Sequence, residues 1–366
     1  MTDSSAALLI SGYYGFGNFG DEAILRVFVD EWRRRRPCDS MSVLSADPPA
    51  TRRAYGVNAV ARSAWPAVLA AVRSADLVLS GGGGLLQDAT SMRSLLYYTA
   101  VLRAAQRAGR TNVIFAQGIG PLGFVGRAIV RRACAKVTLA CVRDEQSARL
   151  LRDILPALDV SVVADPVFLA SIAPSAQDAA TLEREGLKGV DGPLIAVVVR
   201  PALALTKAAP KLAACIDHLT RRYGAHVVLV PFQSPEDVEA AIEVIRLCRS
   251  APVLLGGGYD LPLMAALFAR CSAVIAMRLH ALILAAKLAI PFVAVSYDPK
   301  VDALLSRLRY PLGGLGADSD GPQLADALWN RRAALRECLE RSASELERSA
   351  ADAFDMLQRL VEGTVG

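Results

Sequence analysis

Short runs of apolar residues alternate with segments of helical periodicity along most of the chain. Within residues 23–35 and 95–108, for example, apolar positions recur every three or four residues, which is typical of amphipathic helices. Strands that alternate with helices predict parallel sheets covered by helices on both faces, an α/β fold. In the first half of the chain the predicted strands are Leu8–Ile10, Met41–Ser45, Asp76–Ser80, Asn112–Ala116, Val137–Val142 and Val160–Ala164.

The alternation is interrupted at residues 171–192, where a polar segment rich in Glu, Ser and Gly separates two similar halves. We therefore expect an N-terminal domain over residues 1–172 and a C-terminal domain over residues 190–322. Residues 323–366 predict one or two helices that dock on the domains to bury their leucines. In the second half the predicted strands are Leu194–Arg200, His226–Pro231, Val253–Leu255, Ala273–Met277 and Phe292–Ser296.

The composition is consistent with two buried cores, since 53% of the 366 residues are hydrophobic and 21% are charged. Lys287 and Pro291 interrupt the apolar run that comes nearest to the length of a membrane span. The first residues lack the basic segment of a signal peptide, so we expect a soluble, cytoplasmic protein. A net charge of +5 does not by itself indicate a nucleic-acid partner.

Seven cysteines are scattered along the chain without a Cys-x-x-Cys pair. This spacing predicts buried thiols in a reducing compartment and no metal site. The four arginines at positions 33–36 are expected to form the solvated end of a helix, where cations complement the helix dipole. Contact with an anionic membrane surface is the alternative for this run, so we expect at most peripheral membrane contact.

Ionisable side chains follow two successive predicted strands of the C-terminal domain. Arg278 and His280 come directly after one strand, and Tyr297, Asp298 and Lys300 follow the next. Because the carboxyl ends of parallel strands meet at one edge of a sheet, we expect these side chains to converge. Three potential cations at that edge predict an anionic ligand. The plainer alternative is that the histidine caps a helix and that the cations are solvated.

The first predicted strand is followed by Gly15, Gly17 and Gly20, in the G-x-G-x-x-G spacing of dinucleotide-binding loops. Asp21 and Glu22 come next, in the first turn of the following helix. Two carboxylates there would repel a pyrophosphate, so the loop is better suited to present a carboxylate than to bind a dinucleotide. The alternative is that both acids only complement the helix dipole.

Other strand ends carry glycines and arginines that suit a binding site. Four consecutive glycines begin at Gly81, and a second glycine loop begins at Gly256, so the backbone can approach a ligand closely in both places. Arg143 is expected at a strand end outside the core, and Arg200 ends the first strand of the second half. The candidate binding residues of these strand ends are Gly81, Gly82, Gly83, Gly256, Gly257, Arg143 and Arg200.

Together the strand-end motifs resemble those of the polysaccharide pyruvyl transferase family, and most closely its bacterial cell-wall branch. The motifs extend from residue 12 to residue 300 and cover most of the chain, so jointly they are far more specific than one glycine loop. The motifs are Gly12-Tyr-Tyr-Gly-Phe-Gly-Asn-Phe-Gly-Asp-Glu22, Gly81-Gly-Gly-Gly-Leu-Leu-Gln-Asp88, Gln117-Gly-Ile-Gly-Pro121, Val142-Arg-Asp144, Asp165-Pro166, Met277-Arg-Leu-His280 and Ser296-Tyr-Asp-Pro-Lys300.

The resemblance implies two Rossmann-like domains that face a cleft, as in GT-B glycosyltransferases. It implies transfer of pyruvate from phosphoenolpyruvate to two hydroxyls of a sugar as a cyclic ketal, with no redox cofactor. The acceptor would be a cell-wall polysaccharide or its lipid-linked precursor, at the inner face of the membrane. Glu22, Arg143, His280 and Lys300 match the family's functional positions, and Arg278 follows from its place in the same motif.

Phosphoenolpyruvate carries a carboxylate and a phosphate, and guanidinium groups bind both in bidentate fashion. We therefore expect Arg143, Arg278 and Lys300 to hold this donor, with the donor site on the C-terminal domain. His280 is the candidate general acid that protonates the vinyl carbon. Glu22, on an acceptor-binding N-terminal domain, would take the hydroxyl proton or orient the sugar, and the sequence equally permits the two roles to be exchanged.

Three other functions are compatible with parts of the sequence. A sugar-nucleotide glycosyltransferase would share the fold and the Gly256 loop, and tight binding of a nucleotide sugar would favour it. A dinucleotide-dependent dehydrogenase would use the first glycine loop, but the two acids that follow it argue against this. An inactive ligand-binding relative could regulate cell-wall synthesis, although it would not need Glu22, Arg143, His280 and Lys300 together.

Overall fold

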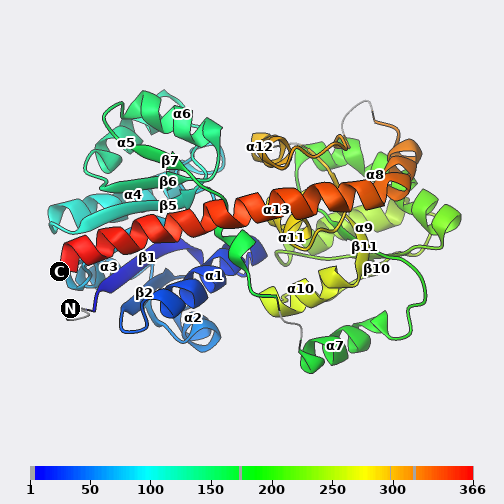
Figure 1. Cartoon of the computed structure of the whole chain (residues 1–366), viewed down its shortest axis with the longest axis horizontal. Helices are drawn as coiled ribbons and strands as arrows, with labels where there is room; N and C mark the ends of the chain where they lie inside the picture. The colour runs from blue at the N-terminus through cyan, green and yellow to red at the C-terminus, as the bar shows by residue number, and fades with distance from the viewer. Residues whose placement is uncertain (1–4, 173–174, 297, 316–318, 366) are drawn as a thin grey trace. The chain divides into compact units, whose positions relative to one another are not determined.

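The chain forms two compact units, each with its own parallel sheet (Figure 1). Unit 1 comprises residues 1–169 and 346–366, and unit 2 comprises residues 170–345. Both sheets alternate strands with helices, which confirms the expected α/β fold with parallel sheets covered by helices. The computed structural model describes residues 5–172, 175–296, 298–315 and 319–365.

Unit 1 contains a 7-stranded parallel sheet with the order β3-β2-β1-β4-β5-β6-β7. The strand order reverses between β1 and β4, which pair from Leu8 beside Leu77 to Ser11 beside Ser80. The loops that leave these two strands therefore start side by side at one edge of the sheet. The strands are β1 (Ala7–Tyr14), β2 (Ser40–Ser45), β3 (Asn58–Ala61), β4 (Leu77–Gly81), β5 (Thr111–Gln117), β6 (Leu139–Val142) and β7 (Val160–Val162).

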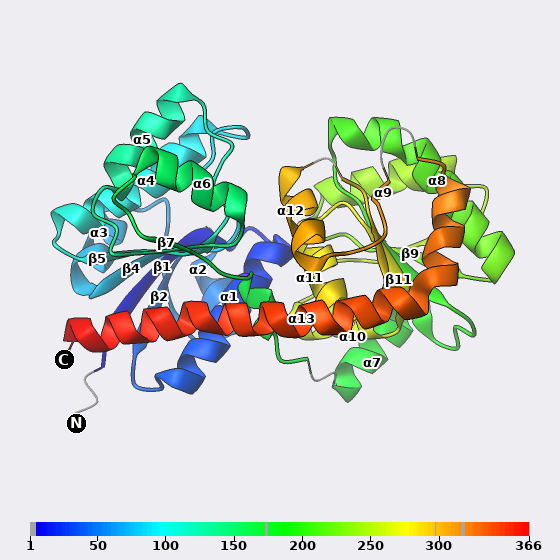
Figure 2. The same cartoon turned by 45° about the horizontal axis from the view of Figure 1, so that its top comes forward.

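Helices cover both faces of this sheet because successive strand residues point to opposite sides. On one side Leu8 and Ile10 pack with residues of α1 (Phe19–Arg35) and α2 (Pro48–Tyr55). On the other side Leu9 packs with two helices, and two more helices continue the same layer (Figure 2). These four helices are α3 (Trp65–Ser74), α4 (Met92–Arg107), α5 (Phe124–Cys134) and α6 (Glu145–Ile154). A short 3₁₀ helix, η1 (Pro166–Leu169), follows the last strand.

Unit 2 contains a 5-stranded parallel sheet with the order β10-β9-β8-β11-β12. Its strands are β8 (Leu194–Val198), β9 (His226–Leu229), β10 (Val253–Leu254), β11 (Cys271–Ala276) and β12 (Phe292–Ala294). Two short helical segments, α7 (Ala176–Leu182) and the π-helical turn η2 (Glu183–Leu187), precede the sheet. The other helices are α8 (Leu203–Tyr223), α9 (Glu236–Leu247), α10 (Leu261–Ala269), α11 (Leu279–Lys287) and α12 (Pro299–Leu308).

The C-terminal residues form one long helix, α13 (Gly321–Val365), where the sequence allowed one or two. Leu328 and Leu335, in its first part, are buried in the core of unit 2. Phe354 and Leu357, in its last part, are buried in the core of unit 1. The helix thus buries its leucines as its apolar periodicity predicts, with each part supplying a different core.

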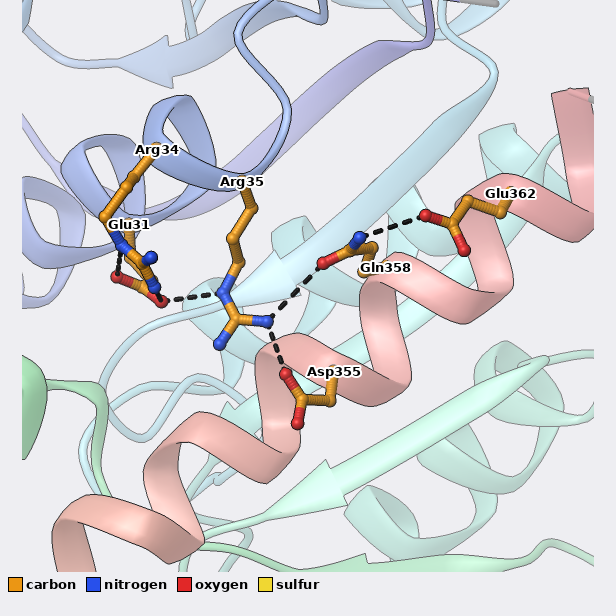
Figure 3. A network of polar contacts seen from close by, with 6 residues as sticks. All are labelled: Glu31, Arg34, Arg35, Asp355, Gln358 and Glu362. Atoms are coloured by element: carbon orange, nitrogen blue, oxygen red, sulfur yellow. Dashed lines mark hydrogen bonds and ion pairs between the residues drawn. The ribbon is translucent and has the colours of Figure 1, made fainter. Parts of the chain in front are cut away.

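The C-terminal end of α1 contacts the last part of α13 through a polar network (Figure 3). Arg35 donates to Glu31 at 2.6 Å and pairs with Asp355 of α13. Burial raises the pKa of Glu31, but hydrogen bonds from Arg34 and Arg35 outweigh this effect and lower that pKa below its usual value. The Glu31 carboxylate therefore remains an ionised partner of Arg35 at neutral pH.

The expectation that residues 33–36 form a solvated helix end is wrong for Arg35 and Arg36. The Arg35 side chain is only 12% exposed, and Arg36 is buried against Asp39, with an ion pair at 3.1 Å. The guanidinium carbon of Arg35 also lies over the ring of Phe354, 5.6 Å from its centroid. Arg34, Arg35 and Arg36 therefore pair with acids within unit 1, whereas the exposed Arg33 donates to the carbonyl of Gly56 at 2.6 Å.

Candidate functional site

In unit 1 the glycine loops and Arg143 lie at the same edge of the sheet. The backbone N–H of Gly118, after β5, donates to the carbonyl of Gly83, after β4, at 3.0 Å. The N–H of Arg143, after β6, donates to the carbonyl of Gln117 at 3.1 Å. The ends of β4, β5 and β6 are thus joined by backbone hydrogen bonds, as expected for adjacent parallel strands.

The glycines after β4 are required by the packing of Tyr14 beneath them. The Tyr14 hydroxyl donates to the carbonyl of Gly81 at 2.9 Å, and a Cβ on Gly82 would lie 2.6 Å from that hydroxyl oxygen. Gly82 also has a φ of +84°, which other residues rarely adopt. Burial, followed by the nearby charges of Asp21 and Glu22, raises the pKa of Tyr14 well above its ordinary value, so its hydroxyl remains a neutral donor.

Asp21 and Glu22 point in different directions from the first turn of α1. One Glu22 carboxylate oxygen accepts from the N–H of Gly15 at 2.7 Å, and the other accepts from the hydroxyl of Tyr55 at 2.5 Å. The Asp21 carboxylate instead lies against Gly83, where a Cβ would collide with it. Glu22 therefore braces the loop between β1 and α1, while Asp21 lies beside the glycine loop after β4.

Arg143 is buried, so the expectation that it lies outside the core is wrong. The residue is only 8% exposed, and its Nη1 donates to Asp165 Oδ2 at 3.1 Å. The other oxygen of Asp165 accepts from the N–H of Val167 at 3.1 Å, which fixes the carboxylate in place. The guanidinium lies flat against Gly118, where a Cβ would come within 3.0 Å of Nε. Arg143 is consequently held in one orientation at the strand end.

In unit 2, Arg278 is held by an acid from another strand end. Arg278 occupies the N-cap position of α11, and its Nε donates to Asp237 Oδ2 at 2.7 Å, while Nη2 pairs with Oδ1. Asp237 is fully buried and also accepts from the N–H groups of Phe232 and Gln233, at 3.0 and 3.1 Å. The carboxylate therefore fixes one edge of the guanidinium. His280 follows in the first turn of the same helix and is half-buried.

The other cations of unit 2 come from strands that flank β11. Arg200 follows β8, and Lys300 follows β12, so both strands are direct neighbours of β11 in the sheet. The carboxylate of Asp298 caps α12 by accepting from the N–H of Lys300 at 3.0 Å. The sheet order thus places Arg200, Arg278, His280 and Lys300 at the ends of three adjacent strands. Tyr297, which the sequence assigned to this group, lies outside the described residues.

The Gly256 loop lies elsewhere on unit 2. It follows β10, which is separated from β11 by β9 and β8. The N–H of Gly256 donates to Glu185 at 2.8 Å, and Glu185 also accepts from the hydroxyl of Tyr259 at 2.6 Å. Gly257, with a φ of +75°, lies against Pro231. These contacts close the loop on η2, and the sheet order does not bring it beside Arg278.

Sequence reasoning did not single out Asp237 as a site residue, and it noted Asp165 only as part of a strand-end motif. Asp237 lies in the first turn of α9, where an acid ordinarily complements the helix dipole. Neither pairing follows from local pattern, because each joins an arginine to an acid from a different strand end. The informative signal would have been that acids and arginines both occur at strand ends of one sheet.

No three His, Cys, Asp or Glu side chains come together in a way that could hold a metal ion, within the part of the chain that the structure describes. Across the same residues, the helices are all too short or too polar to span a membrane. The seven cysteines are free, and Cys134, Cys141, Cys215 and Cys271 are buried. The prediction of buried thiols is therefore confirmed for these four.

The sequence and fold can be compared with known proteins. The family model described as polysaccharide pyruvyl transferase matches residues 18–299. A search of curated proteins gives no significant match.

Solved structures with similar folds have low sequence identity. A glycosyltransferase from Rickettsia africae has a TM-score of 0.65 at 8% identity, over 98% of this chain and 99% of its own. UDP-GlcNAc 2-epimerase from Neisseria meningitidis, bound to UDP-GlcNAc, has a TM-score of 0.61 at 12% identity, over 96% and 99%. A family 9 glycosyl transferase from Veillonella parvula has a TM-score of 0.52 at 13% identity, over 90% and 98%. These similarities establish a GT-B-like fold for the chain.

Proposed function

We propose that this chain, which belongs to the polysaccharide pyruvyl transferase family, transfers pyruvate from phosphoenolpyruvate to a sugar and forms a cyclic ketal. The observation that carries the proposal is the set Arg200, Arg278, His280 and Lys300, at the ends of three adjacent strands. Three cations beside one histidine suit a small ligand with two anionic groups that must be protonated on carbon.

The donor carries a carboxylate and a phosphate on a vinyl carbon. In the proposed reaction, Arg278 and Lys300 bind these anionic groups in unit 2, with Arg200 beside them, and Arg143 of unit 1 provides a further guanidinium. The buried carboxylate of Asp237 holds Arg278 in one orientation before substrate arrives, which lowers the entropy cost of binding. Neither a redox cofactor nor a metal ion takes part in the proposed steps.

The chemistry begins with protonation of the methylene carbon, which becomes a methyl group and leaves an oxocarbenium-like centre at the adjacent carbon. A sugar hydroxyl attacks this centre and loses its proton. The C–O bond to phosphate then breaks, phosphate leaves, and a second hydroxyl closes the ketal while its proton passes to the departing phosphate. We assign the first proton to His280 and the hydroxyl proton to Glu22. Exchanging these two roles remains compatible with the residues, and Asp21 is a second acid at the same loop.

We propose the glycine loop at Gly81, Gly82 and Gly83 as part of the acceptor side, on unit 1. These three residues are buried, and the Asp21 carboxylate lies against Gly83, so the sugar would be bound at this loop through Asp21. Gly256 and Gly257 are proposed as a further backbone contact for a substrate.

The acceptor would be a cell-wall polysaccharide or its lipid-linked precursor, in line with the bacterial cell-wall branch. A cytoplasmic location at the inner face of the membrane would give access to such a precursor, and no nucleic acid is required.

A sugar-nucleotide glycosyltransferase is the second candidate function, because glycosyltransferases and a UDP-GlcNAc epimerase share the fold. Fold alone does not determine activity. The two functions differ in the ligand that the free protein binds, so ligand-induced stabilisation distinguishes them.

The experiment measures the melting temperature with phosphoenolpyruvate, UDP-GlcNAc or NAD at matched concentrations. A ligand that binds only the folded state at about one hundred times its Kd stabilises it by about 2.7 kcal/mol. We expect phosphoenolpyruvate alone to raise the melting temperature. A shift with UDP-GlcNAc and none with phosphoenolpyruvate would instead support the glycosyltransferase.

A second experiment identifies the acceptor. Mass spectrometry compares cell-wall glycan from cells with and without the protein, and the acceptor is the glycan that loses a pyruvate ketal.

A further inference from the structure

The layer formed by α3, α4 and α5 on unit 1 has an unusual charge composition. All charged residues of these three helices are arginines, and none of the helices contains Asp or Glu. The whole chain has 36 acidic residues and a net charge of only +5, so its acids are concentrated elsewhere. The arginines of the layer are Arg73, Arg93, Arg103, Arg107, Arg127, Arg131 and Arg132.

These arginines differ from Arg34, Arg35 and Arg36, which form ion pairs within unit 1. Among the residues that the structure describes, none of the seven arginines of the layer forms an ion pair. Arg93, Arg103, Arg107, Arg127 and Arg131 are also exposed. Their charge is therefore available to an external anionic partner.

The same layer exposes large apolar side chains. Phe124 and Val125, in the first turn of α5, are 91% and 59% exposed. Leu96 is 48% exposed and Met92 is 37% exposed, one turn apart on α4, and Trp65 at the start of α3 is 37% exposed. Single exposed apolar residues are common, but five on three helices that contain no acid favour a partner that binds both apolar and cationic groups. The loop residue Asp88 lies at the start of α5, where it accepts from the N–H of Gly123 at 2.9 Å.

The three helices form one surface. They pack in sequence, α3 against α4 and α4 against α5, and Gln106 of α4 donates to the carbonyl of Ala133 of α5. A groove of about 410 Å³ lies between α3 and α4, with Trp65 and Leu69 among its apolar walls and Arg103 and Arg107 among its basic residues. Helices α3, α4 and α5 lie in one layer of unit 1 (Figure 2), and the groove brings apolar and basic side chains of α3 and α4 together.

We propose that this α3–α5 face is the surface by which the chain binds an anionic phospholipid bilayer. Arginines attract anionic head groups, and exposed Phe, Leu, Met and Trp side chains enter the boundary between head groups and acyl chains. A nucleic acid would satisfy the arginines but would leave the aliphatic side chains in water, so charge and apolar exposure together favour the bilayer. The inference deepens the proposed location at the inner face of the membrane, and it does not depend on which reaction the protein catalyses.

The first test measures cosedimentation of the full chain with vesicles. Vesicles of phosphatidylcholine alone are compared with vesicles in which about one third of the lipid is phosphatidylglycerol. We expect binding to the anionic vesicles, and a roughly tenfold or greater loss in the variant R127E/R131E. The control R53E/R348E makes the same change in net charge at exposed arginines of α2 and α13. It should bind within about twofold of the wild type, since it lies outside the face.

The second test measures insertion. The variant F124W contains one additional tryptophan, whose emission is obtained by subtracting the wild-type spectrum. On anionic vesicles this difference emission should shift to shorter wavelength, because the new side chain leaves water. The control L203W replaces a residue that is 92% exposed on unit 2, and its added emission should not shift. Both substitutions are at exposed positions, so dichroism and melting temperature should match the wild type.

Four outcomes would overturn the inference. These are no binding to anionic vesicles, equal loss of binding in the test and control charge variants, tighter binding to an oligonucleotide than to vesicles, and a dimer that R127E/R131E dissociates. The phosphoenolpyruvate melting shift is measured separately. If vesicle binding holds and that shift is absent, the proposed reaction is wrong and the surface stands. If the shift is present and vesicles are not bound, only the surface is wrong.

Discussion

Asp237, which is fully buried, accepts hydrogen bonds along one whole edge of the Arg278 guanidinium, although 41 residues separate the two in sequence. Arg143 and Asp165 form a second pair of this kind in unit 1, with exposed side-chain fractions of 7% and 3%. In both pairs the acid is itself held by backbone N–H groups. A guanidinium held in this way presents its remaining donors in a fixed plane, which suits a planar carboxylate or a phosphate.

The first prediction concerns Arg278. Lysine retains the positive charge but cannot make the two-point contact with Asp237, so R278K should lower kcat/KM for phosphoenolpyruvate by roughly a hundredfold. D237N should cause a smaller loss that appears mainly in KM, because Arg278 remains but is less well oriented. The matched control R246K changes an exposed arginine of α9, the helix that carries Asp237. Steady-state kinetics with near-normal turnover in R278K would show that Arg278 does not bind the donor.

The second prediction concerns Arg143. Because the residue is buried, R143A leaves Asp165 without its cation and should destabilise the protein by roughly 3–5 kcal/mol in urea unfolding. R143K should be less destabilised, yet it should lose nearly as much turnover as R143A if the planar fork binds substrate. Activity is compared at a temperature where dichroism shows both variants folded. An active R143K would restrict Arg143 to a structural role with Asp165.

The alternation of strands with helices, and the residues that follow most strands, could be predicted from sequence, because buried parallel strands are continuous apolar runs. Arg200, Arg278 and Lys300 follow three strands that prove to be neighbours. The pairs with Asp165 and Asp237 could not be predicted, since 22 and 41 residues separate their members and only the fold brings them together. The direction of Glu22, toward Gly15 and Tyr55, likewise depends on a helix that the sequence pattern did not reveal.

Elements that sequence reasoning missed are short or contain proline. β3 has four residues, and α2 begins at two prolines that resemble a loop. Helix α8 begins at Leu203 and continues through Pro210. A proline within a helix usually ends it, but here Leu205, Ala209 and Leu212 are buried on one side, so tertiary packing outweighs the local signal.

The third prediction separates the two acids of α1. Glu22 makes two hydrogen bonds that brace its loop, so E22Q should lower the melting temperature slightly and slow turnover if Glu22 also accepts the hydroxyl proton. D21N changes the acid beside Gly83 and leaves those bonds intact. If E22Q remains fully active at a folded temperature and D21N loses roughly a hundredfold in kcat, the base is Asp21. The pH dependence of kcat, measured for both variants, tests the same assignment independently.

The fourth prediction concerns the thiols. Burial raises the pKa of Cys134, Cys215 and Cys271 to about 12, so each remains an unreactive neutral thiol at pH 8. Cys38 is exposed and should be the first site that iodoacetamide alkylates in the native protein. Mass spectrometry of digested samples locates the label, and addition of urea should expose all seven thiols. Rapid native alkylation of Cys215 would contradict the burial that the structure assigns to it.

The last prediction follows the proton that His280 is proposed to deliver. If the vinyl carbon is protonated before the sugar attacks, the product carries a methyl group where the donor had a methylene, and the added hydrogen comes from solvent through the enzyme. The reaction in heavy water should therefore give a ketal methyl with one deuterium, read by mass spectrometry and proton NMR. H280A should form this product roughly a hundredfold more slowly, as expected for loss of a general acid.

Two controls make the result specific to His280. H226A removes the exposed histidine at the start of β9, whose ring contacts the carbonyl of Asp191 at 3.0 Å, and it should form the product at the normal rate. H280N tests whether a polar group of similar size, without an ionisable proton, restores the rate; we expect that it does not. A product that keeps its methylene as an enol ether would identify a simple enolpyruvyl transfer. A deuterated methyl formed by H280A at the full rate would move the acid role to Glu22, because the carbon must still be protonated and Glu22 is the other proposed proton-transfer residue.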